Sequence, residues 1–226
     1  KAVPQIDRWT AAWSVMRAQV CSEAEIDGTR SPASYELSVA CLDERRDELA
    51  GLLEVLGDSA ATDVQLVIPA IAGLEPVGPC AERGFLERRP EPPASDARHQ
   101  VEALRRELMR VQGLLAAGRY NQGLERAEAL LAAAEALGYR PLAIEARAMV
   151  GSLAAHAELF DHGEEALKRA YLEAGSVGMD DLAARAAGQL VSTVGIGRAR
   201  PAEGLLWALP AEMLIQRLVQ HRGLLG

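Results

Sequence analysis

The chain has 226 residues, with 24 basic and 32 acidic side chains, a net charge of −8, and 49% apolar residues that include only nine aromatics. This composition excludes a disordered or collagen-like chain and argues against an all-β sandwich, so we expect a mainly helical protein. Residues 1–96 carry 9 basic and 17 acidic groups, whereas residues 97–226 carry 15 of each. Neither part has the positive excess of a nucleic-acid-binding protein, so we expect no nucleic-acid partner.

No apolar run is long enough for a membrane span, because the best one, residues 64–74, contains Gln65 and Pro69. No signal peptide begins at Lys1. The chain starts without methionine and ends at Gly226, so we expect a fragment whose targeting segment lies outside it. We expect no membrane insertion of the fragment itself.

The first 95 residues predict an N-terminal helical segment. Apolar residues at helical spacing begin at Ile6 and include Trp9 and Trp13, which favours a helix ending at Asp27-Gly28 with both tryptophans in its core face. A partner-binding patch is the alternative for the two tryptophans.

A second helix is predicted to begin at Pro32, with Ser31 as its N-cap, and to form an antiparallel hairpin with the first. A third helix is expected from Asp58 or Ser59 to about Ala72, and Pro90–Pro93 reads as a stiff linker.

Residues 96–226 contain an internal repeat. Gly123, Gly163 and Gly204 are 40 and 41 residues apart, each near the start of the second helix of a predicted helical hairpin. A residue without a side chain lets two helix backbones approach at this point. Tyr120 and Phe160, three residues before the first two glycines, are expected to fill the gap between hairpins. The three predicted units span about residues 97–139, 140–179 and 180–223.

An aromatic residue followed three positions later by a small one resembles the tetratricopeptide repeat (TPR). This resemblance implies an all-α fold in which the N-terminal hairpin or bundle is followed by a right-handed superhelix of about three hairpins. The period exceeds the usual 34 residues, and Pro201 replaces the aromatic in the third unit. HEAT-type repeats, with periods of about 40–47 residues, remain the alternative.

The whole chain is also similar to the C-terminal region of bacterial eukaryotic-like serine/threonine protein kinases. The resemblance implies a non-catalytic region of a kinase, often preceded by a membrane helix that would place it outside the cytoplasm; a cytoplasmic location is the alternative. The residues that carry the resemblance are Cys21, the stretch 38–49, Pro79-Cys80, 101–105 and 114–120.

Catalytic motifs are missing from the sequence. It has no glycine-rich phosphate loop, no His-Arg-Asp and no Asp-Phe-Gly, and Gly195-Ile196-Gly197 reads as tight helix packing or a helix end. We therefore expect no ATP binding, no catalytic residues and no cofactor, and an enzyme is the weakest hypothesis.

Cysteine and histidine spacing predicts no metal site. No Cys-x-x-Cys pair occurs, and His156 and His162 are six residues apart across a predicted turn. Cys21 and Cys41 flank the first hairpin turn, so they form either a disulfide or two buried thiols, with Cys80 left over.

The TPR resemblance implies a groove lined by the first helix of each hairpin. Gln112, Ser152 and Thr193 would form a polar ladder in it for an extended peptide, and a solvated polar face is the alternative interpretation. Leu108 and Leu115 also fall at groove positions and belong to an apolar stripe. The complete set of implied polar groove residues is Arg105, Gln112, Glu145, Ser152, His156, Gln189 and Thr193.

Two functions follow from these observations. The leading hypothesis is a protein-interaction or sensor module of a bacterial serine/threonine kinase that binds a protein or peptide. The second is an oligomerising scaffold, or the TPR-like arm of a bacterial transcription regulator, with homo-oligomerisation as an option.

Overall fold

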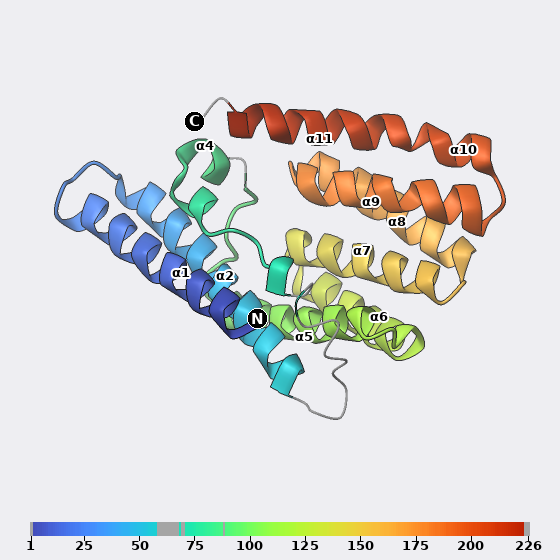
Figure 1. Cartoon of the computed structure of the whole chain (residues 1–226), viewed down its shortest axis with the longest axis horizontal. Helices are drawn as coiled ribbons and strands as arrows, with labels where there is room; N and C mark the ends of the chain where they lie inside the picture. Colours follow the sequence, from blue (N-terminus) through green and yellow to red (C-terminus); the bar gives the residue numbers. More distant parts are fainter. Residues whose placement is uncertain (1, 58–67, 69–70, 88, 224–226) are drawn as a thin grey trace. The chain divides into compact units, whose positions relative to one another are not determined.

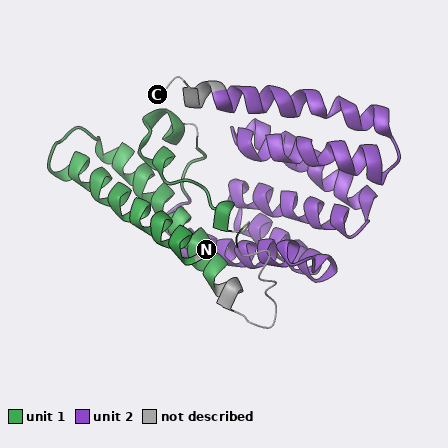
Figure 2. Ribbon diagram, in the orientation of Figure 1, with its two compact units in different colours: residues 1–92 green, residues 93–226 purple. Residues whose placement is uncertain are grey.

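The computed structural model describes residues 2–57, 68, 71–87 and 89–223. This part of the chain consists of helices and their connections and contains no strand (Figure 1). The predicted all-α class is therefore confirmed. The chain divides into two compact units, Lys1–Pro92 and Pro93–Gly226 (Figure 2).

The first unit is built on a helical hairpin. Helix α1 (Ala2–Glu25) and helix α2 (Pro32–Gly57) are joined by a turn in which Gly28 has a positive φ of 63°. The backbone amide of Ser34 donates a hydrogen bond to Ser31 Oγ at 3.3 Å, so Ser31 caps α2 as predicted. The predicted hairpin is confirmed.

Most of the predicted third helix, from residue 58 to 72, lies outside the described residues. Ile68, Ile71 and Ala72 are described and helical. After them come a 3₁₀ turn, η1 (Gly78–Ala81), and one helical turn, α4 (Arg83–Leu86).

The two N-terminal tryptophans anchor the hairpin. Trp13 Nε1 donates a hydrogen bond to the Leu42 carbonyl oxygen at 2.7 Å, and Trp9 Nε1 donates one to the Glu75 carbonyl oxygen at 3.2 Å. Both rings pack against a buried cluster, so their predicted place in the core is confirmed. The cluster comprises Val20, Cys41, Leu42, Val77, Cys80 and Leu86.

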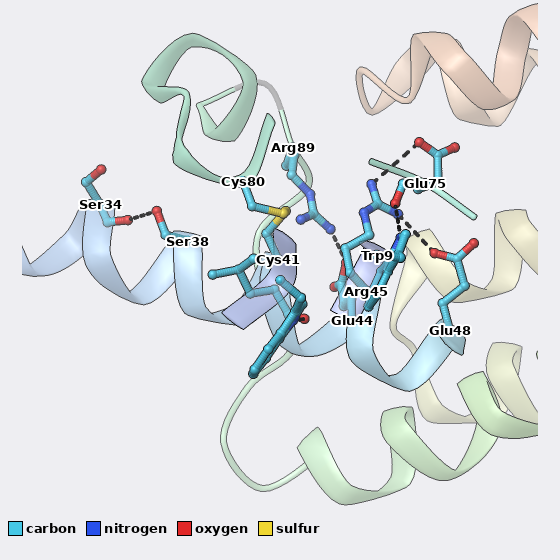
Figure 3. Close-up of a disulfide and its surroundings, with 12 residues drawn as sticks. Trp9, Ser34, Ser38, Cys41, Glu44, Arg45, Glu48, Glu75, Cys80 and Arg89 are labelled. Atoms are coloured by element: carbon cyan, nitrogen blue, oxygen red, sulfur yellow. Dashed lines mark hydrogen bonds and ion pairs between the residues drawn. A yellow bond between two sulfur atoms is a disulfide. The ribbon is translucent and has the colours of Figure 1, made fainter. Parts of the chain in front are cut away.

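The disulfide of the first unit joins Cys41 to Cys80, with 5.5 Å between their Cα atoms (Figure 3). Neither arrangement expected for Cys21 and Cys41, a mutual disulfide or two buried thiols, is present, because Cys41 is bonded to Cys80 and Cys21 is a free, half-buried thiol. Cys21 lies four residues before the end of α1, whereas Cys41 lies nine residues after the start of α2. At about 1.5 Å of rise per residue, the two cysteines are offset by about 7 Å along the hairpin.

The second unit contains three successive helical hairpins. The first is α5 (Arg98–Ala116) with α6 (Tyr120–Leu137), and the second is α7 (Arg140–His156) with α8 (Phe160–Ser176). In the third, α9 (Asp180–Ser192) runs into a π-helical turn, η2 (Thr193–Gly197), and the return is made by α10 (Pro201–Leu206) and α11 (Ala208–Gly223).

The turn inside each hairpin has one residue in the left-handed region, at a position that recurs every 40 or 41 residues. Gly118 has a φ of 71°, Glu158 of 62° and Ala199 of 52°. Only the first of these is a glycine, so the other two turns place a side chain where L-residues are disfavoured. The 40-residue period of the sequence is therefore also present in the backbone conformation.

The three repeat glycines lie at close approaches between helices. A Cβ atom at Gly163 would lie 3.0 Å from the Ala155 amide nitrogen, and one at Gly204 would lie 2.5 Å from Gly195 Cα. At Gly123 the nearest atom would be Leu153 Cδ2 of the following hairpin, at 2.7 Å.

The aromatic residues before these glycines pack against the next hairpin. The rings of Tyr120 and His156 have centroids 5.1 Å apart. Phe160 covers Gly197, where a Cβ atom would lie 2.3 Å from the ring. Both aromatics therefore contact the end of the following first helix, and Pro201 occupies the equivalent place in the third hairpin.

Helix α7 lies at the centre of the second unit and packs against α5, α6, α8 and α9. Twelve of its 17 residues are buried, including Leu142, Ile144 and Leu153. Within the described residues, no helix is long and apolar enough to cross a membrane.

Candidate interaction surface

The polar residues implied by the TPR resemblance lie on the first helices of the three hairpins. Helix α5 contacts α7, and α7 contacts α9, so these first helices form one continuous row. We call this the first-helix row.

Two charged groove positions lie together. Arg105 on α5 and Glu145 on α7 form an ion pair with 3.7 Å between the nearest nitrogen and oxygen atoms. Forty residues after Glu145, at the same repeat position on α9, is Arg185, which pairs with Asp181 at 3.0 Å. The repeat spacing was the signal that could have added Arg185 to the predicted groove residues.

Two of the three residues in the predicted polar ladder, Ser152 and Thr193, are buried and hydrogen-bonded within the protein. Ser152 is only 6% exposed, and its hydroxyl donates to Gln189 Oε1 at 2.7 Å, which links α7 to α9. Thr193 is 4% exposed and its hydroxyl donates to the backbone oxygen of Gln189 at 2.9 Å. Gln189 is therefore a connector between helices, and the hydroxyls of Ser152 and Thr193 are not presented to a peptide.

Gln112 and His156 are the exposed members of the predicted set. Gln112 lies on α5 seven residues after Arg105, so the two share one helix face. His156 Nδ1 lies 2.8 Å from the backbone oxygen of Ser152, and its ring is held by the Tyr120 contact. With Arg185 added by the repeat spacing, the exposed groove positions of the first-helix row are Gln112, His156 and Arg185.

Leu108 and Leu115 differ in burial. Leu108 is 3% exposed and belongs to a core cluster of the second unit with Leu130 and Leu142. Leu115 is half-buried and packs against a second cluster that contains Val111 and Leu153. Leu108 is therefore part of the hairpin core.

Arg147 connects α7, the first helix of the second hairpin, to α6 and α8. The sequence alone did not reveal this role. The Arg147 guanidinium donates to Glu135 on α6 at 2.5 Å and to Glu173 on α8 at 3.0 Å. Burial alone would lower the pKa of Arg147, but its hydrogen bonds to Glu135 and Glu173 outweigh burial and raise the pKa. Arg147 therefore stays charged and crosslinks three helices.

A second charged cluster surrounds Glu164 on α8, which is 6% exposed. Its carboxylate pairs with Lys168, with Arg200, and with Arg198 at 3.4 Å. The equivalent residue of the first hairpin is Leu124. Because Arg198 and Arg200 belong to the third hairpin, the cluster joins α8 to that hairpin.

The described part of the chain holds no group of three His, Cys, Asp or Glu side chains that could bind a metal ion. His162 Nδ1 lies 3.7 Å from Glu128 Oε1. His162 is on α8 and His156 is on α7, so the two histidines lie on different helices.

No protein-family model, curated protein or solved structure matches the chain.

Proposed function

We propose that the second unit is a protein-interaction or sensor module that binds a protein or peptide along its first-helix row. The observation that carries this proposal is the row itself: α5, α7 and α9 follow one another in contact and expose Gln112, His156 and Arg185. Stacked helical hairpins commonly use such a surface for extended partners.

A TPR-like superhelix is the architecture proposed for the row. Support comes from the 40-residue recurrence of the left-handed turn positions Gly118 and Glu158, and from the close approaches at Gly163 and Gly204. The order of helix contacts also supports it, because each second helix packs against the first helix of the next hairpin.

We place this module in the non-catalytic region of a bacterial serine/threonine kinase. This part of the proposal rests on the sequence resemblance. The Cys41–Cys80 disulfide favours an oxidising compartment, which agrees with the extracytoplasmic side of a membrane-anchored kinase.

A second candidate is an oligomerising scaffold or the arm of a transcription regulator. The observation that favours it is the burial of Ser152 and Thr193, because their hydroxyls hold helices together instead of facing a ligand.

Selection from a displayed peptide library against the whole chain tests the leading proposal. We expect enriched peptides whose affinity falls at least about tenfold when Gln112 and Arg185 are both replaced by alanine. The matched control replaces Glu165 and Leu172, which are exposed on α8, by alanine and leaves the affinity unchanged. Peptides that bind the first variant as tightly as the natural chain would contradict a binding site on the first-helix row.

A further inference from the structure

One arginine of the first unit lies between two carboxylates. Arg45 is on α2, and its guanidinium lies 3.6 Å from Glu48 Oε2 on the same helix and 3.8 Å from Glu75 Oε2 on the segment that precedes η1 (Figure 3). When all three side chains are ionised, two negative charges share one positive charge. We call these three residues the Arg45 cluster.

The Arg45 cluster is largely shielded from water. The side chains of Arg45 and Glu48 are 17% and 22% exposed, and that of Glu75 is 34% exposed. Within the described residues, the buried atoms Glu48 Oε2 and Arg45 Nε have no hydrogen-bond partner. A carboxylate in such a place has lost water without a full set of hydrogen bonds in return, so the ionised form of Glu48 is costly.

Glu75 connects the cluster to the rest of the first unit. Trp9 Nε1 on α1 donates a hydrogen bond to the Glu75 carbonyl oxygen, and the backbone amide of Glu75 donates one to the Glu48 carboxylate on α2. Two residues further along, Val77 lies in the buried cluster that contains the disulfide. Residues 74–77 are therefore held to both helices of the hairpin at Glu75, and the charge of Glu48 acts on this contact.

The charge of Glu48 depends on pH. Burial raises the pKa of Glu48 above 4.5; the positive charge of Arg45 opposes this rise, and the negative charge of Glu75 adds to it. Among the described residues, these are the two charged groups that act on Glu48, and α1 contributes the uncharged Trp9. The folded state therefore favours protonated Glu48. This stabilisation is complete below pH 4.5 and is lost as the pH rises through the raised pKa.

We propose that the Arg45 cluster makes the contact between α2 and residues 74–77 sensitive to pH. In the tight state Glu48 is protonated, and Arg45 pairs with Glu75 alone. At higher pH Glu48 releases its proton to water, so two carboxylates share one guanidinium and their repulsion loosens the contact at Glu75. The contact lies in the first unit, and the proposal does not rest on peptide binding by the second.

NMR of the Trp9 indole N–H tests the proposal, because this group donates to the Glu75 carbonyl oxygen. We expect its chemical shift in the natural chain to titrate with a midpoint above pH 4.5. Glu48→Gln, which is neutral at every pH, should remove this titration, and Glu75→Gln should lower its midpoint because the like charge is gone. The control is Glu36→Gln, which alters an exposed carboxylate on α2 and should leave the titration unchanged. Trp9→Phe identifies the signal.

Hydrogen exchange supplies a readout that needs no variant. The protection of the backbone amides in residues 74–77, corrected for the intrinsic exchange rate at each pH, should be lower at pH 7 than at pH 4.5 in the natural chain. Glu48→Gln should keep the higher protection at pH 7, and circular dichroism checks that it is folded. Two results would overturn the proposal: a Trp9 signal that titrates identically in Glu48→Gln and the natural chain, or natural-chain protection that is equal at both pH values.

Discussion

The guanidinium of Arg30 donates a hydrogen bond to the backbone oxygen of Ala81, 3.0 Å away, directly beside the disulfide-bonded Cys80. Arg30 lies in the turn between α1 and α2, and it also donates to Ser38 Oγ at 2.8 Å and pairs with Glu23 at 2.6 Å. One side chain therefore joins the hairpin turn to the segment that the disulfide fixes to α2.

Removal of the disulfide should destabilise the first unit. Replacing Cys41 and Cys80 by alanine frees a loop with a sequence separation of 39 residues, which predicts a loss of about 3–4 kcal/mol of unfolding free energy. Denaturation followed by tryptophan fluorescence measures this, because Trp9 and Trp13 lie in the first unit. The control Cys21→Ala leaves the disulfide intact and should change stability much less. A double variant as stable as the control would show that the crosslink contributes little.

Glu23 should stabilise the first unit in a pH-dependent way. Hydrogen bonds from Gln19 and Arg30 lower the pKa of Glu23 below 4.5. The folded state therefore favours the ionised carboxylate, so its stabilisation is present above pH 4.5 and is lost as the pH falls through the lowered pKa. Glu23→Gln should reduce stability at neutral pH by less than about 1 kcal/mol, in keeping with a partly exposed ion pair.

Thermal unfolding of Glu23→Gln and the natural chain at several pH values measures this difference. Glu25→Gln, on the same helix at an exposed position, is the control. A difference that is the same at pH 3 and pH 7 would contradict the assigned role of Glu23.

Gly204 should not tolerate a side chain. The three atoms nearest to a Cβ atom there all belong to the backbone, among them Gly195 Cα at 2.5 Å and the Val191 oxygen at 2.8 Å. Gly204→Ala should therefore cost about 1–3 kcal/mol, because the two helices must separate. Gly188 on α9 has no atom within 4 Å of such a Cβ, and Gly188→Ala should add about 0.5–1 kcal/mol through helix propensity. Chemical denaturation followed by Trp207 fluorescence compares the two variants, and equal midpoints would refute the close approach.

Ala199 occupies the left-handed turn position that Gly118 occupies in the first hairpin. Ala199→Gly should stabilise the second unit by up to about 1 kcal/mol, because relief of the backbone penalty exceeds the added entropy of the unfolded chain. Gly118→Ala should instead destabilise the second unit. Ala202→Gly, at an exposed helical position in α10, should destabilise by about 1 kcal/mol. Calorimetric melting measures all three, and a loss of stability in Ala199→Gly would contradict the assignment of strain to this turn.

Local signals in the sequence predicted much of the fold. Two of these signals depend on neighbouring residues only: the helical spacing of Trp9 and Trp13, and the N-cap residue Ser31. The structure confirms the buried side of the first helix and the cap of the second. The pairing of Cys41 was missed because it depends on the path of the segment around Cys80, which helical periodicity does not describe.

The candidate surface was harder to predict for a related reason. Burial of Ser152 and Thr193 depends on the rotation of each helix about its own axis, and a shift of one residue turns a helix face by about 100°. Arg147 was not among the predicted residues, because its two carboxylate partners come from other helices.

The central place of α7 has a consequence for how the second unit unfolds. Helix α7 packs on helices of both neighbouring hairpins, whereas within the second unit α5 packs mainly on α6 and α7, and α11 mainly on α9 and α10. In a linear array with nearest-neighbour coupling, the ends can fray while the middle persists. The amides of α7 should therefore exchange only when the whole array opens, and the cooperativity of the second unit depends on this one helix.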